Sequence, residues 1–145
     1  MLFINYLKRS IVLIAILIMA INTSFAQSYY HSPNDTIISN APIDDVSVFN
    51  ITQVHPTSDT IFSHWQKQSA VMPATWEASI CDVAHCYTEL KDSGTTDPIV
   101  TGGDGLMSLH LNPNFEAGTA IIRYSIFTTN TPAQIDTLTW IITAT

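Results

Sequence analysis

The alternation of apolar and polar residues in the last third of the chain limits the possible folds more than any other feature. Leu138, Trp140 and Ile142 occupy every second position within residues 135–143. A period of two places successive side chains on opposite faces of an extended chain, which is typical of a half-buried β-strand. Residues 118–128 repeat the pattern. The sequence therefore predicts two half-buried strands at the C-terminal end.

Further candidate strands lie upstream. They are rich in β-branched and aromatic residues, which fit a pleated surface. Gly, Pro, Asn and Asp, which tolerate the backbone angles of turns, gather between them. The candidate strands cover residues 46–54, 59–67, 76–80, 106–112, 118–128 and 135–143. Short strands at this spacing, about seven in all, predict an all-β fold, an antiparallel β-sandwich.

No stretch after residue 26 repeats apolar residues at helical intervals of three and four. Residues 89–101 are polar and include Gly94 and Pro98, so we expect an exposed loop there. We expect residues 27–42 to form a loose N-terminal lead-in and residues 43–145 to form the single β-sandwich domain.

The first 26 residues have the three parts of a secretory signal peptide. Lys8 and Arg9 precede an apolar run over residues 11–21, and the small-residue site Ser24-Phe25-Ala26 follows. The run is short beside the roughly 20 residues that a membrane-spanning helix needs, so a cleaved signal is favoured over an uncleaved anchor. We expect cleavage after Ala26 and no stable membrane insertion afterwards.

Loss of the signal peptide makes the chain more acidic. The full chain has five basic and twelve acidic residues, a net charge of −7. Without Lys8 and Arg9, three basic residues face twelve acids and the net charge becomes −9. Nucleic acids and anionic membranes bind clustered Lys and Arg. The sequence therefore argues against a nucleic-acid partner.

Cys81 and Cys86 are the two cysteines of the chain. A thioredoxin-like dithiol has two intervening residues and a helix N-terminus that stabilises the thiolate. Here four residues intervene and the flanking sequence is strand-like. In an exported chain the pattern favours a structural disulfide. The loop that it closes can serve as a display site, although stabilisation is the commoner role of short disulfide loops in small exported domains.

A metal centre is the alternative use of these cysteines. His85 adjoins Cys86, while His31, His55, His64 and His110 are scattered along the chain. A blue-copper site requires one Cys, two His and commonly an axial Met, and no His and Met follow Cys86 closely. Two cysteines and one neighbouring histidine leave a tetrahedral zinc site one ligand short. We therefore expect no metal and no cofactor.

Signatures of catalysis are missing from the sequence. It contains no G-x-S-x-G, no phosphate-binding glycine loop followed by Lys, and no H-E-x-x-H. We therefore name no catalytic residue and expect no enzymatic activity.

The run VMPATWEASICDVAHCY at residues 71–87, followed by LHLNPNFEAGTAIIRYSI, resembles a small immunoglobulin-like or cupredoxin-like module of secreted Bacteroidota proteins. That module has a P-x-x-W-E-x-x-I-C-D-x-x-x-C-Y core and an N-P-x-x-x-x-G strand entry. The matching residues are Pro73, Trp76, Glu77, Ile80, Cys81, Asp82, Cys86, Tyr87, Asn112, Pro113 and Gly118. The resemblance spans about residues 45 to 145. It implies an immunoglobulin-like or cupredoxin-like sandwich, often exported by the type IX system, with no assigned activity.

These observations lead to one main hypothesis and two alternatives. The main one is a secreted, non-enzymatic binding or structural module, extracellular, on the cell surface or in the periplasm, with a protein or glycan partner. The first alternative is an envelope redox or copper-handling protein that uses the cysteine pair. The second is a carbohydrate-binding module, suggested by Trp65, Tyr29 and Tyr30; an exposed aromatic strip on one sheet would support it, and burial of Trp65 would count against it.

Overall fold

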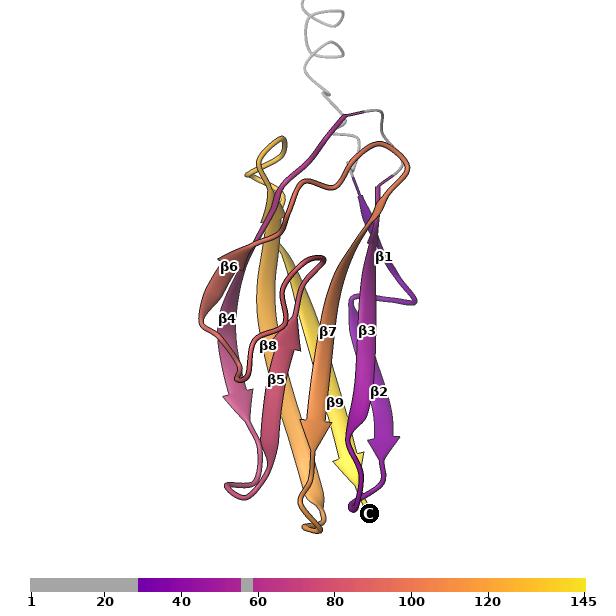
Figure 1. Ribbon diagram of the computed structural model, residues 1–145, viewed down its shortest axis with the longest axis vertical. Coiled ribbons are helices and arrows are strands. Elements are labelled where there is room, and N and C mark those ends of the chain that lie inside the picture. Colours follow the sequence, from indigo (N-terminus) through magenta and orange to yellow (C-terminus); the bar gives the residue numbers. More distant parts are fainter. Residues whose placement is uncertain (1–28, 56–58) are drawn as a thin grey trace, which may run out of the picture.

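The computed structural model describes residues 29–55 and 59–145, which form a two-layer β-sandwich (Figure 1). Sheet A has the strand order β1-β3-β7-β5, and sheet B has the order β2-β9-β8-β4-β6. The strands are β1 (Tyr30–Ser32), β2 (Thr36–Ala41), β3 (Ser47–Val54), β4 (Ser63–Val71), β5 (Glu77–Cys81), β6 (Ser93–Thr95), β7 (Asp104–Asn112), β8 (Gly118–Thr128) and β9 (Asp136–Ala144). The predicted all-β sandwich is confirmed, with nine strands in the described residues instead of about seven.

The N-terminal part of the fold differs from its prediction. Residues 30–41 are not a loose lead-in, because β1 pairs with β3 in sheet A and β2 pairs with β9 in sheet B. The β2–β9 pair is parallel, so the sandwich is not wholly antiparallel. Both strands are short, and their alternation is too brief to identify them from the sequence. The predicted signal peptide, residues 1–26, lies outside the described residues.

The prediction of an exposed loop over residues 89–101 is also wrong in its centre. β6 pairs with β4, and Thr96 and Ile99 are buried. Gly94 lies opposite Trp65 in the β4–β6 register, and its missing side chain leaves room for the Trp65 ring. A glycine in a polar stretch usually marks a loop, but here it permits close packing.

Replacing Gly94 by alanine tests this packing. A Cβ at this position would lie 2.2 Å from Cζ2 of Trp65, so the ring or the strand has to move. Overpacking of this kind costs roughly 1–3 kcal/mol, and we expect Gly94→Ala to lower the free energy of unfolding by that amount in urea titrations. Gly102→Ala is a poor control because Gly102 has a positive φ. Ser93→Ala, on the same strand and exposed, should change stability little.

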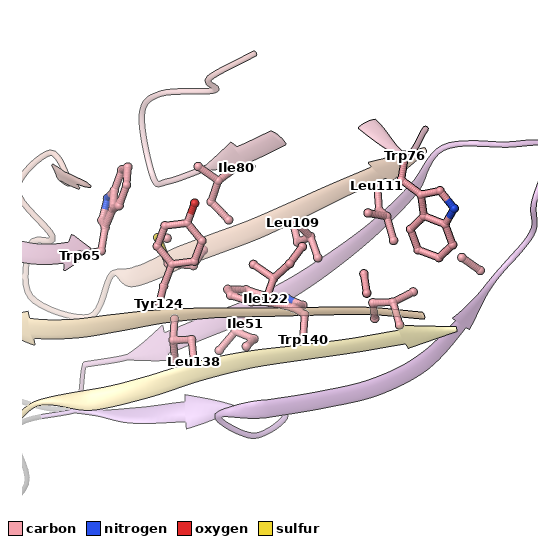
Figure 2. Close-up of a cluster of buried hydrophobic side chains, with 14 of the residues drawn as sticks. Ile51, Trp65, Trp76, Ile80, Leu109, Leu111, Ile122, Tyr124, Leu138 and Trp140 are labelled. Carbon is pink, nitrogen blue, oxygen red and sulfur yellow. The ribbon is translucent and has the colours of Figure 1, made fainter. Parts of the chain in front are cut away.

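The core lies between the two sheets (Figure 2) and includes Leu138, Trp140 and Ile142, the alternating apolar residues of the last predicted strand. The largest fully buried side chains include Trp65, Trp140 and Tyr124. The Tyr124 ring lies between the two indoles, with edge-to-face centroid distances of 5.7 Å to Trp65 and 6.3 Å to Trp140. Such edge-to-face pairs are favourable for aromatic rings in a core.

Each of the three indole N–H groups donates a hydrogen bond. Trp140 donates to the carbonyl oxygen of Phe49 at 3.0 Å, which ties β9 of sheet B to β3 of sheet A. Trp76 donates to the carbonyl of Glu116 at 3.0 Å. Trp65 donates to the carboxylate of Asp82, in the turn that follows β5. A buried donor without a partner would be costly, so these bonds fix how the layers meet.

Two buried tyrosines should make the fold sensitive to alkali. Burial, together with the nearby charge of Asp136, raises the pKa of Tyr29 well above its usual range, and burial with the nearby charge of Asp92 does the same for Tyr124. The folded state binds these two phenolic protons more tightly than the unfolded state does. The stability that they contribute is therefore complete below the unfolded pKa of about 10, and it is lost as the pH rises further. We expect part of the tyrosinate absorbance to appear only together with unfolding. Complete ionisation in the folded protein would contradict this.

Residues 29–55 and 59–145 contain no helix of the length and apolar character that crossing a membrane requires.

Candidate functional site

The two cysteines form a disulfide at the end of β5, as predicted. Cys81 is the last residue of this strand and lies opposite Ser108 of β7. Cys86 lies beside Cys81 in an isolated antiparallel bridge. We call residues 81–86 the clipped turn. No cysteine in the described residues is free, so neither sulfur is a metal ligand in this state.

Backbone hydrogen bonds make the clipped turn a tight hairpin. The amide of Tyr87 donates to the carbonyl of Ile80 at 3.0 Å, and the amide of Asp82 donates to the carbonyl of His85 at 2.8 Å. Val83 and Ala84 form the exposed tip. The disulfide lies between these two hydrogen bonds, so the turn is closed both covalently and by backbone pairing.

Asp82 anchors the clipped turn to the core. Its buried carboxylate accepts hydrogen bonds from the indole N–H of Trp65 at 3.1 Å and from the hydroxyl of Tyr87 at 3.4 Å. The other carboxylate oxygen accepts from the amides of Ala84 at 3.2 Å and His85 at 3.0 Å. One side chain therefore satisfies a core donor and the donors of the turn together. This arrangement fixes the turn relative to the sandwich.

Tyr87 adds a layer of aromatic contacts beside the turn. Its ring meets Trp65 edge to face at 5.6 Å and stacks on His85 at 6.3 Å. The ammonium of Lys91 lies 4.3 Å from the ring centre, a cation–π contact. Burial, together with the charge of Asp82 and the hydrogen bond to it, raises the pKa of the Tyr87 hydroxyl.

A shallow, open groove of about 430 Å³ lies on sheet A near the disulfide. Its polar lining includes Glu77 and Ser79 of β5, Thr88, and His110 and Asn112 of β7. Nε2 of His110 lies 3.4 Å from Sγ of Cys81, so the groove adjoins the disulfide. The groove and the exposed tip of the clipped turn form the candidate site. It combines the polar groups of the groove with the small apolar tip formed by Val83 and Ala84.

The described residues do not assemble a metal centre. Within residues 29–55 and 59–145, no three His, Cys, Asp or Glu side chains lie close enough to hold an ion. His85 contacts Asp82 at 3.5 Å, and His110 contacts the disulfide. His31, His55 and His64 bond to Asp136, to Asp59 and to Thr95, respectively. The copper-handling alternative therefore lacks a ligand set in this part of the chain.

The aromatic residues considered for sugar binding are mostly buried. Trp65 is 1% exposed and Tyr29 is fully buried, whereas Tyr30 is 51% exposed. A sugar-binding strip requires several aromatic faces in solvent. Burial of Trp65 in the core between the sheets counts against the carbohydrate-binding alternative.

Two residues of the site were not identified from the sequence. Asp82 belongs to the core motif, but nothing in its spacing shows that its carboxylate is buried against an indole. The sequence assigns no face to Trp65, which lies two positions from Ser63 on the buried face of β4. The alternation within β4 is the signal that could have placed it inward.

The chain resembles known proteins in its fold and not in its sequence. The sequence matches no family model and no curated protein. The solved N-terminal domain of PorA is similar, with a TM-score of 0.60, 14% identity and coverage of 75% of this chain and 86% of that domain. PapD-like domain 7 of human CEP192 has a TM-score of 0.47 and 10% identity over 84% of this chain and 89% of that one. The similarity to the PorA domain shows a shared immunoglobulin-like β-sandwich fold.

Proposed function

We propose that this chain is an exported, non-enzymatic β-sandwich module that binds a protein partner through the clipped turn and the adjoining groove. The proposal includes removal of residues 1–26 and a place outside the cell, on its surface or in the periplasm. It also groups the chain with the exported Bacteroidota modules that its Cys81–Cys86 core resembles.

The anchoring of the clipped turn is the observation that carries the proposal. Val83, 39% exposed, and its neighbours Ala84 and His85 are held by a disulfide on one side and by the buried Asp82 carboxylate on the other. A surface that is rigid before binding loses little conformational entropy when it binds. Both a covalent bond and a core side chain hold the clipped turn. This double anchoring favours a binding role for the turn over a role limited to closing the loop.

Site-specific photocrosslinking in the producing cells tests this role. A photoreactive residue at Val83 should give a discrete protein adduct. The same residue at Val100, which is also exposed but lies in a different loop, should not. Equal adducts from both positions, or none from Val83 under conditions in which the protein is exported, would argue against a binding role for the turn.

A redox role is the second candidate, and one contact favours it. The imidazole of His110 lies 3.4 Å from Cys81 Sγ, and Cys86 is exposed. A protonated imidazole stabilises a neighbouring thiolate, which would assist reversible reduction of an accessible disulfide. This candidate requires that a fraction of the exported protein carries free thiols.

A further inference from the structure

The sheet edges of this sandwich are protected unequally. β1 and β6 are edge strands of three residues each. β5, the other edge of sheet A, is partly covered because the chain returns and Tyr87 bonds to Ile80. The remaining edge is β2, with six residues and no proline, charge or bulge. Proteins usually blunt exposed edges with such features, because open edges pair with other chains.

The backbone of β2 has one side available for pairing. The carbonyl of Asp35 accepts a hydrogen bond from the amide of Thr139 at 2.8 Å. In the parallel β2–β9 ladder this bond determines which β2 residues direct their backbone N–H and C=O groups toward β9, and we call this pattern the phase of the ladder. In this phase the backbone groups of Ile37 face β9, and those of Thr36, Ile38 and Asn40 point away from the sheet. Within residues 29–55 and 59–145, no strand pairs with this outer side.

An apolar row crosses the outer face of sheet B and ends at this edge. Cross-strand register aligns Ile38 of β2 with Ile141 of β9, then with Ile121 of β8 and Val71 of β4. Ile38 is 76% exposed and Val71 is 65% exposed, so both ends of the row lie in solvent. We call these four residues the apolar row.

The charge distribution around β2 suits a second copy of the chain. Copies of an acidic chain repel one another, and close approach is opposed least where carboxylates are absent. The rows that flank the apolar row contain no carboxylate. They consist of Asn40, Thr143 and Thr119 on one side and Thr36, Thr139, Arg123 and Ser69 on the other.

We propose that two copies pair antiparallel along β2, about a two-fold axis through Ile38. Ile38 then lies opposite Ile38 of the second copy, and Thr36 lies opposite its Asn40, so the outward backbone groups of both strands are satisfied. Asp35 falls opposite Ala41, and no two carboxylates meet. The two apolar rows join into one continuous row across a single extended sheet. This surface is separate from the clipped turn and does not depend on the function proposed above.

Sedimentation equilibrium over a range of concentrations tests this interface. The protein is expressed with its own leader and purified from the exported fraction. We expect a reversible dimer. Ile38→Lys should raise its dissociation constant by about tenfold or more, because two ammonium groups then face each other at the axis. Asn40→Pro should act similarly, because it removes an outward N–H without breaking a bond to β9.

Val71→Lys is the matched control. It places the same charge in the same row at its other end, far from the β2 edge, and should leave the dimer intact. Loss of the dimer with both lysine variants would show packing of the sheet faces instead of edge pairing. A monomer at every concentration, or a dimer unaffected by Ile38→Lys, would overturn the proposal. Circular dichroism melting curves confirm that each variant is folded.

Discussion

Replacing Asp82 by alanine should lower the free energy of unfolding by about 2–4 kcal/mol. The change leaves the indole N–H of Trp65 buried without an acceptor and removes the acceptor of two turn amides. Each buried donor left unsatisfied costs about 1–3 kcal/mol, although solvent can reach the amides of the exposed turn. Urea or thermal unfolding measures the loss. Asp92→Ala, which removes an exposed carboxylate paired with Lys67, should cost far less.

A double-mutant cycle separates the anchor from other effects of the substitution. Trp65→Phe removes the indole N–H but also changes the core volume, so its own cost is large. The cost of Asp82→Ala should be smaller by about 1–2 kcal/mol in the Trp65→Phe background than in the wild type. Additive costs would mean that the hydrogen bond between Trp65 and Asp82 contributes nothing, and the anchoring role of Asp82 would be wrong.

Removing the disulfide should lower the free energy of unfolding by about 2 kcal/mol. The loop between Cys81 and Cys86 is short, so its closure restricts the unfolded chain only modestly. The Cys81→Ala/Cys86→Ala variant should still fold, because the anchor at Asp82 and the pairing of β5 with β7 remain. Reduction of the wild type should give a similar loss. An unchanged stability after reduction would contradict a stabilising role.

Strands with a sustained period of two could be predicted from the sequence. The inward faces of β7, β8 and β9 follow the alternation of Leu109, Tyr124 and Trp140 with their neighbours, and all three side chains are buried. Burial of alternate residues on one face produces this pattern directly. The disulfide between Cys81 and Cys86 could also be predicted, from the cysteine spacing and the expected export of the chain.

Pairings between segments distant in the sequence could not be predicted. β2 is short and has no sustained alternation of apolar and polar residues, and only its pairing with β9 identifies it as a strand. β6 depends on the absence of a side chain at Gly94, next to the ring of Trp65. The contact between Asp82 and Trp65 joins the turn that follows β5 to β4 of the other sheet, and an isolated acid gives no sign of its burial. Long-range packing, not local preference, determines these features.

Intact-mass analysis of the exported protein tests the central claim, an exported module whose turn is locked by a disulfide. The protein is alkylated before and after reduction and weighed under non-reducing conditions. The mass should correspond to a chain that begins at Gln27, with Cys81 and Cys86 protected from alkylation until reduction adds two labels. Retention of residues 1–26 would contradict removal of a signal peptide. Immediate labelling of both thiols would contradict the locked turn and favour the redox role.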